Sequence, residues 1–157
     1  MKDLPRVVFD CNVLLQAAAR ERSVAAKCLN LAESGLIQLC LSREVLAEVE
    51  DVLNRPEIRA HFPDLSDEIV GAFLKRLQKL SMFVRLVPKE FSYPRDEDDE
   101  PYINLAVATG ADLALVQTLV LVDNQRHDPT LTLFVSWPPL RSLGYYSLRP
   151  LVYQLQT

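Results

Sequence analysis

The chain has 157 residues, of which 49% are apolar, and its formal net charge is −4. This length suffices for one α/β core and leaves little room for a second, so we expect a single domain over residues 1–157. The negative charge excludes a generic basic nucleic-acid binder, because phosphate contacts draw on a surplus of Lys and Arg. It is compatible with an acidic metal centre that has a local basic rim.

The sequence indicates a cytoplasmic protein without a membrane segment. No apolar run approaches the ~20 residues of a membrane span, and no apolar segment follows Met1. The three cysteines, Cys11, Cys28 and Cys40, form no CxxC pair, which favours reduced thiols. The two histidines, His61 and His127, have no neighbours at zinc-ligand spacing.

The expected elements alternate along the chain. In order, we expect a strand at Arg6–Asp10, helices at Val13–Ala19 and Val24–Ser34 with a stop at Gly35, a strand at Leu36–Leu41, a helix at Arg43–Asn54, a connector through Pro56 and Pro63, a helix at Ser66–Leu80, a strand at Met82–Val87, a loop from Pro88 to Asp98, a helix at Asp99–Thr109 and strands near Leu113–Val122 and Leu131–Ser136. This alternation predicts a three-layer α/β/α fold with a central parallel sheet.

The first expected strand ends on a carboxylate. Val7, Val8 and Phe9 form an apolar run that stops at Asp10, and Asn12 follows two residues later. Alternation along an extended chain would place Asp10 and Asn12 on the same side. The carboxyl ends of parallel strands open into the crevice that α/β sheets use for ligands. We therefore interpret Asp10 as a candidate active-site residue.

The helix after the second strand carries two candidate acids. Ser42 is a natural N-cap, and an apolar stripe follows it (Val45, Leu46, Val49, Val52 and Leu53). Glu48 and Glu50 flank this stripe on opposite sides. Periodicity alone does not choose between them.

Five consecutive acids, residues 96–100, precede a segment with Pro101 in its first turn and Gly110 as its stop. Acids before a helix are favoured by its dipole, so Asp96, Glu97, Asp98 and Glu100 are expected to solvate the helix start. Asp99 differs, because it sits at the expected N-cap and the apolar Tyr102 and Ile103 follow it. We therefore expect Asp99 to lie near the buried side of this helix.

Basic and aromatic residues offer no unique nucleic-acid surface. Arg20, Arg22, Lys27 and Arg43 could border the strand ends, and a second cluster comprises Lys75, Arg76 and Lys79. The sequence does not show which cluster, if either, touches RNA. The aromatic residues of the C-terminal segment, Trp137, Tyr145, Tyr146 and Tyr153, favour packing or a subunit interface over base stacking.

Taken together, these motifs resemble a PIN domain. They are Asp10-x-Asn12, Ser42-x5-Glu48, Arg55-Pro56, Asp96-x2-Asp99 leading into Ile103-x2-Ala106, and Gly110-Ala111-Asp112. Their order is most similar to the VapC-like branch, which contains toxins of toxin–antitoxin systems. The likeness runs from about Val7 to Val116 and resumes weakly at Val135 to Leu143.

The resemblance implies a PIN-like fold in which three or four acids hold one or two divalent ions for the cleavage of RNA. By this resemblance Asp10, Glu48 and Asp99 would be the metal-binding acids, and Asn12 and Ser42 would orient them. The sequence departs from the family at the fourth acid, because residues 113–122 contain no carboxylate. Asp123 could replace it, and Asp128 is a poorer substitute.

The residue types agree with this chemistry. Clustered carboxylates repel one another and need a cation to stay ionised together, and oxygen ligands suit Mg²⁺ or Mn²⁺. The family also implies an RNA substrate, a cognate antitoxin protein and a homo-oligomer.

Two alternatives come from other classes of protein. A haloacid-dehalogenase-type phosphatase would use Asp10, Ser42, Lys75 or Lys79, and Asp98-Asp99, but an acid should then stand where Asn12 does. A catalytically degenerate PIN-like module that binds RNA or a protein partner is motivated by the missing fourth acid.

Overall fold

A computed structural model describes residues 4–90, 92, 98, 100–111, 113–118 and 130–135, the last two segments by their backbone. It contains a five-stranded sheet and six helices within these residues. In chain order the elements are β1 (Arg6–Phe9), α1 (Cys11–Ala19), α2 (Val24–Glu33), β2 (Gln38–Ser42), α3 (Arg43–Asn54), α4 (Pro56–His61), α5 (Asp67–Leu80), β3 (Met82–Val84), α6 (Glu100–Thr109), β4 (Leu113–Thr118) and β5 (Thr130–Val135).

The strand order in the sheet is β3-β2-β1-β4-β5. The pairs β3–β2, β2–β1 and β1–β4 are parallel, and Val8 of β1 is in register with Cys40 of β2 and Ala114 of β4. The parallel centre of the predicted sheet is confirmed. The edge strand β5 runs antiparallel to β4, so the predicted sheet is not parallel throughout. Antiparallel edge strands on parallel sheets are common.

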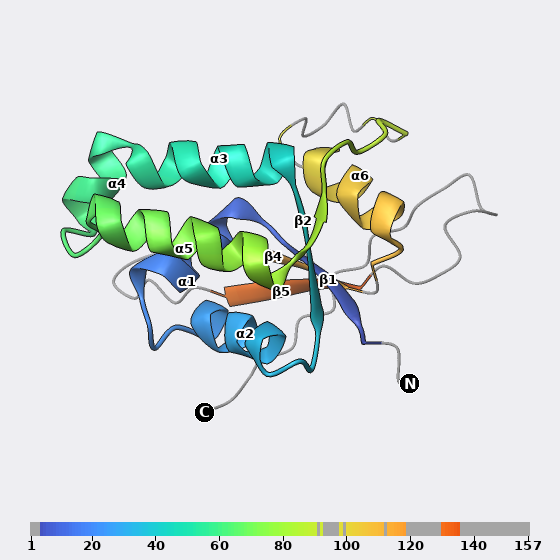
Figure 1. Ribbon diagram of the computed structural model, residues 1–157, viewed down its shortest axis with the longest axis horizontal. Coiled ribbons are helices and arrows are strands. Elements are labelled where there is room, and N and C mark those ends of the chain that lie inside the picture. The colour runs from blue at the N-terminus through green and yellow to red at the C-terminus, as the bar shows by residue number, and fades with distance from the viewer. Residues whose placement is uncertain are drawn as a thin grey trace.

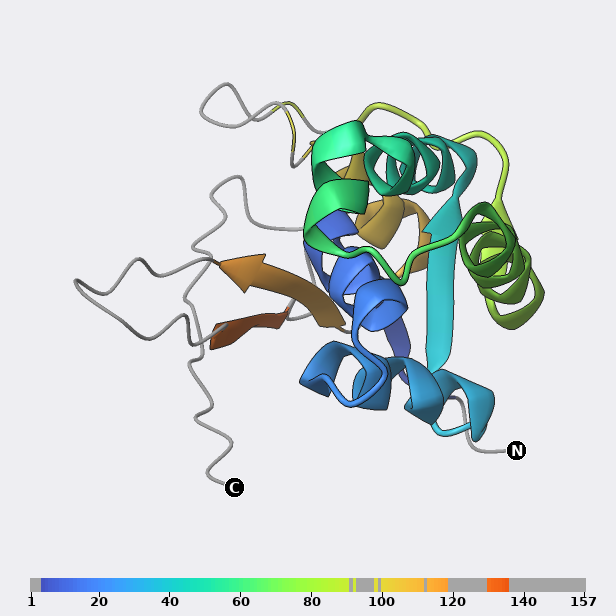
Figure 2. The ribbon, with the colours of Figure 1, turned by 90° about the vertical axis from the view of Figure 1, so that its left-hand side faces the viewer.

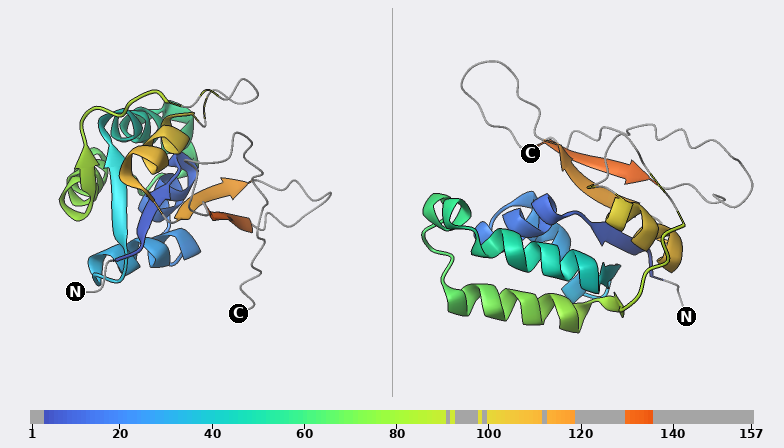
Figure 3. Two further views of the ribbon diagram at one scale, coloured as in Figure 1. Left: turned by 90° about the vertical axis from the view of Figure 1, so that its right-hand side faces the viewer. Right: turned by 90° about the horizontal axis from the view of Figure 1, so that it is seen from above.

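Helices cover the sheet on both faces, which confirms the α/β fold. Figure 1 shows α3, α4 and α5 on one side of the strands and α6 on the other. Figure 2 and the left view of Figure 3 agree, with α1 and α6 on opposite sides of β1. Right-handed crossovers require this arrangement, because the chain moves from β1 to β2 to β3 in one direction and returns to β4 through α6.

Most predicted helix ends are confirmed by their caps. The hydroxyls of Ser23, Ser42 and Ser66 accept backbone N–H bonds from the first turns of α2, α3 and α5. The stops at Gly35 and Gly110 follow α2 and α6 with φ of 68° and 61°, a region that favours glycine.

Pro56 corrects one prediction. The expected connector contains the short helix α4, and Pro56 is its first residue. Proline is tolerated at this position because the first N–H of a helix has no intrahelical partner. The break at Arg55 therefore separates two helices, α3 ending at Asn54 and α4 beginning at Pro56.

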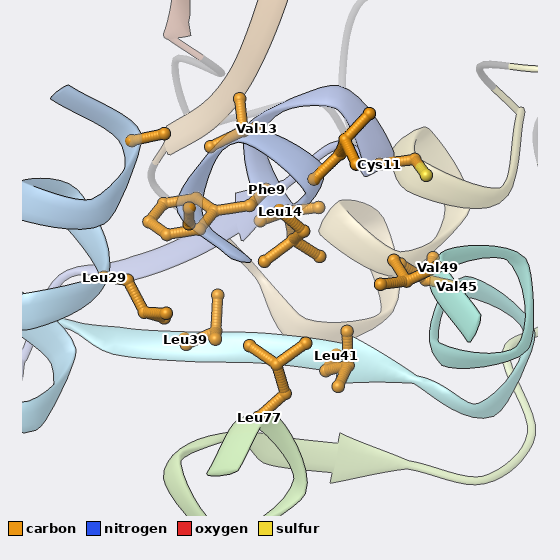
Figure 4. Packing of buried hydrophobic residues seen from close by; sticks show 14 of the residues in the cluster. Phe9, Cys11, Val13, Leu14, Leu29, Leu39, Leu41, Val45, Val49 and Leu77 are labelled. Atoms are coloured by element: carbon orange, nitrogen blue, oxygen red, sulfur yellow. The ribbon is translucent and has the colours of Figure 1, made fainter. Parts of the chain in front are cut away.

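The core lies between the sheet and the helices. Its largest fully buried side chains include Phe9 of β1, Leu39 and Leu41 of β2, Leu14 of α1 and Leu77 of α5. Figure 4 shows these side chains packed together. This packing holds the carboxyl ends of β1 and β2 side by side, where α1 and α3 begin.

In the described part of the chain, no helix is both long and apolar enough to cross a bilayer. Several predictions lie outside the described residues: those for the acids at 96, 97, 99, 123 and 128, for His127, for the strand positions 119–122 and 136, and for the aromatic residues from Trp137 onward.

We predict that Leu41→Ala lowers the free energy of unfolding by about 2–5 kcal/mol, because Leu41 is 1% exposed and truncation leaves a cavity in the core. Urea unfolding followed by circular dichroism measures the change. Leu86→Ala is the matched control, since Leu86 is 89% exposed, and it should change stability by less than about 0.5 kcal/mol. Equal losses in both variants would contradict the described packing.

Candidate active site

Asp10 lies at the junction of β1 and α1. It is the N-cap of α1, and the Val13 N–H donates to its Oδ1 over 2.7 Å. Its exposed fraction is only 6%, which is low for a carboxylate. The N-terminus of α1 carries a partial positive charge that stabilises a negative group at this position. Asp10 is therefore a fixed acid at the carboxyl end of the central strand.

Asn12 is not placed by the expected strand alternation. The helix begins at Cys11, so Asn12 lies in the first turn of α1 and its side chain is exposed. The alternation argument fails because the Asp10 cap turns the chain into a helix at once. Asn12 remains at the same edge as Asp10, but on a helix.

The second candidate acid comes from α3. Ser42 ends β2, and its hydroxyl accepts the Val45 N–H over 3.1 Å, which fixes the start of this helix. Val45, Val49 and Leu53 are buried on one side of the helix. Glu48 is half-buried beside this side, whereas Glu50 is exposed. The structure thus separates two acids that periodicity leaves equivalent.

Tyr102 joins α6 to α1 and α3. Its hydroxyl accepts the Cys11 N–H over 3.1 Å and donates to Glu48 Oε2 over 2.5 Å. The side chain is buried, with 7% exposed. Burial raises the pKa of Tyr102, and the bond to Glu48 and the negative charges nearby raise it further, so the phenol stays protonated and remains a donor.

The sequence analysis missed this role of Tyr102 and treated the residue only as an apolar position that follows Asp99. The available signal was the hydroxyl, because a buried tyrosine usually finds a hydrogen-bond partner.

The pKa of the Cys11 thiol reflects the negative charge at this edge of the sheet. Burial raises the pKa of its thiol to about 12, and the carboxylates of Glu48 and Asp10 contribute to the shift. Both acids therefore act on the same group, and the thiol stays protonated near neutral pH.

Asp10 and Glu48 are the two predicted metal-binding acids that the structure describes; Asp99 and Asp123 lie outside the described residues. Among the described residues, no group of three or more His, Cys, Asp or Glu side chains is arranged to hold a metal ion. Asp99 directly precedes Glu100, the first residue of α6, and Tyr102 sits in the first turn of that helix. The β4 segment 113–118 contains no acid.

Arg20 and Arg43, which were both expected to border the strand ends, lie at different helix ends. Arg43 is exposed at the start of α3 beside Ser42. Arg20 caps the far end of α1 and lies 5.6 Å from the centre of the Phe62 ring. Arg76 forms an ion pair with Glu33 over 2.6 Å. Of these three, Arg43 is the one at the edge that holds Asp10.

The fold and this edge define a class of open α/β protein with acids at the carboxyl ends of its parallel strands. A comparison with protein families matches residues 6–117 to the PIN domain. The chain belongs to the PIN domain family. Comparisons with curated proteins and with solved structures give no match.

PIN domains are generally nuclease-like and typically use divalent metals. Because the chain belongs to the PIN domain family, the order of Asp10, Ser42 and Asp98 no longer favours a haloacid-dehalogenase-type phosphatase. The lysines that it would need, Lys75 and Lys79, are exposed on α5.

We predict that Asp10→Asn changes the free energy of unfolding by less than about 0.5 kcal/mol, since Asn caps a helix about as well as Asp. Asp10→Ala should lower it by about 1 kcal/mol, because the Val13 N–H loses its acceptor. Denaturant titrations of both variants measure the difference. If Asp10→Asn is as destabilised as Asp10→Ala, the capping role is wrong.

Proposed function

We propose that this protein is a Mg²⁺- or Mn²⁺-dependent endoribonuclease that hydrolyses phosphodiester bonds of RNA and acts as the toxin of a toxin–antitoxin pair. The observation that carries the proposal is the Tyr102 bridge, which links the helix that Asp10 caps to Glu48. It joins the first turns of α1 and α6 to the side of α3, three segments that are far apart in the sequence. Membership of the PIN domain family supports the same chemistry.

The donor atoms at this edge suit a divalent cation. Asp10, Glu48 and Asp99 would hold the ion, with Asp123 as a candidate fourth ligand. Asp10 and Glu48 offer carboxylate oxygens, which hard ions such as Mg²⁺ and Mn²⁺ prefer. A bound ion would supply an activated water and a positive charge for the phosphate oxygens.

Other residues of the chain would position these acids and the RNA. The Val13 amide fixes one oxygen of Asp10, and the α1 N-terminus favours negative charge beside it. Ser42 acts through the start of α3, the helix that carries Glu48. Asn12, exposed in the first turn of α1, would orient the acids or the RNA backbone. Arg43, exposed at the start of α3 beside Ser42, would contact a phosphate of the RNA.

The resemblance in motif order supports the toxin role, an antitoxin partner and a homo-oligomeric state. The absence of a CxxC pair among the three cysteines favours a cytoplasmic location. The antitoxin would cover the acidic edge in the inactive complex.

A second candidate function has a specific observation in its favour. The β4 segment 113–118 ends with Gln117 and Thr118 and carries no acid, although the resemblance expects one near this point. A degenerate module that binds RNA or protein without cutting would bind Mn²⁺ weakly or not at all. Calorimetric titration with Mn²⁺ separates this reading from the nuclease.

We predict that the purified protein cleaves labelled single-stranded RNA in Mn²⁺ or Mg²⁺ and is inactive with a chelator. Asp10→Asn should lower the cleavage rate by more than about 100-fold. Loss of a residue that only orients a metal ligand already lowers affinity or activity by about 10–100-fold, and Asp10 would be a ligand itself. Asn retains the cap, so this variant tests the charge and not the fold. Cleavage that is equal in Asp10→Asn would show that a contaminant or another site is responsible.

We also predict different effects for the two acids of α3. Glu48→Gln should abolish metal-dependent cleavage, whereas Glu50→Gln should retain wild-type activity within about twofold. The pair is matched in charge and helix, and differs in that Glu48 is half-buried against Tyr102 and Glu50 is exposed. Equal losses in both variants would contradict the assignment of Glu48.

A further inference from the structure

The Tyr102 hydroxyl has a single orientation. A phenol has one proton, and the Cys11 N–H, 3.1 Å away, already approaches the oxygen as a donor. The proton must therefore point at another acceptor, and Glu48 Oε2 lies 2.5 Å away. Such a hydrogen bond to a carboxylate is short and strong.

This hydrogen bond limits the conformations of Glu48. A glutamate on a helix surface can adopt many rotamers, and fixing it costs free energy. Tyr102 holds one carboxylate oxygen in place before any ligand arrives, and the second oxygen can serve as a donor atom for a cation. Preorganisation of this kind reduces the cost of binding.

The hydroxyl is separable from the packing of the side chain. Tyr102 is buried with 7% exposed, so its ring contributes to the core as a phenylalanine ring would. The hydroxyl adds the two hydrogen bonds, to residues that lie 91 and 54 positions away in the sequence. The hydroxyl therefore connects α6 to α1 and α3, and its hydrogen bonds are not part of α6 itself.

We infer that Tyr102 is a positioning residue of the acidic site, which holds the Glu48 carboxylate beside the Asp10 end of α1 for binding of a divalent cation. It acts through Glu48 and does not contact the cation itself. The inference rests on the proposed function, because it assumes that Glu48 is a metal ligand.

The test measures Mn²⁺ affinity directly by calorimetry on the full chain. Tyr102→Phe should raise the Kd for Mn²⁺ about 10-fold, the lower end of the range for partners that orient a metal ligand. Cleavage of RNA by this variant should return toward the wild-type rate as Mn²⁺ is increased.

Thr109→Val is the matched control. Thr109 is also buried in α6, with 5% exposed, and its hydroxyl donates to Leu105 O over 2.8 Å within the same helix. Its removal takes a buried hydroxyl from α6 without touching Glu48. The Kd for Mn²⁺ should stay within twofold of wild type, and thermal unfolding of both variants checks that they are folded.

A double-mutant cycle tests whether Tyr102 acts through Glu48. Glu48→Gln alone and Glu48→Gln combined with Tyr102→Phe should bind Mn²⁺ equally weakly, because the hydroxyl then has no charged ligand to hold.

An unchanged Kd in Tyr102→Phe would overturn the inference and leave the nuclease proposal intact. Equal weakening by Tyr102→Phe and Thr109→Val would also overturn it, as the effect would then be structural. A wild-type protein that binds no Mn²⁺ would overturn both the inference and the proposed function.

Discussion

The hydrogen bond from the Val13 N–H to Asp10 Oδ1 fixes the point at which the central strand ends and the first helix begins. Because β1 pairs with β2 on one side and β4 on the other, this point lies at the middle of the parallel sheet. The bond keeps a carboxylate in a place where only 6% of the residue is exposed. The start of α1 supplies a fixed partial charge that offsets part of the cost of burying it.

Tyr102 extends this arrangement to the other helices. Through one hydroxyl group the first turn of α6 meets the first turn of α1 and the side of α3. Such contacts depend on the crossover that places α6 on the face opposite α3 and α5, with its start at the carboxyl edge (Figure 1). Asp10 and Glu48, which are 38 residues apart in the sequence, are therefore brought to one edge by the topology of the fold.

Local patterns predicted much of this fold. The helix Arg43–Asn54 has the predicted bounds, and the stops at Gly35 and Gly110 follow from the backbone freedom of glycine. The end of the first apolar run correctly pointed to Asp10 as a residue at the carboxyl edge. These features depend on residues a few positions apart, and such signals are the most readable in a single sequence.

The features that the sequence did not predict arise from tertiary contacts or from competing local rules. Periodicity leaves Glu48 and Glu50 equivalent, and the tertiary structure distinguishes them, because Glu48 is half-buried and bonded to Tyr102 whereas Glu50 is exposed. Asn12 was misplaced because capping by Asp10 overrides strand alternation at Cys11. The direction of β5 depends on its pairing with β4, which no local pattern encodes.

The proposed site requires that Asp10 and Glu48 bind one divalent cation. The most direct test is a crystal of the protein grown with Mn²⁺, with anomalous diffraction recorded to locate the ion. We predict an anomalous peak within about 2.0–2.4 Å of carboxylate oxygens from both residues. A fully occupied peak elsewhere, or none at this edge at millimolar Mn²⁺, would contradict it.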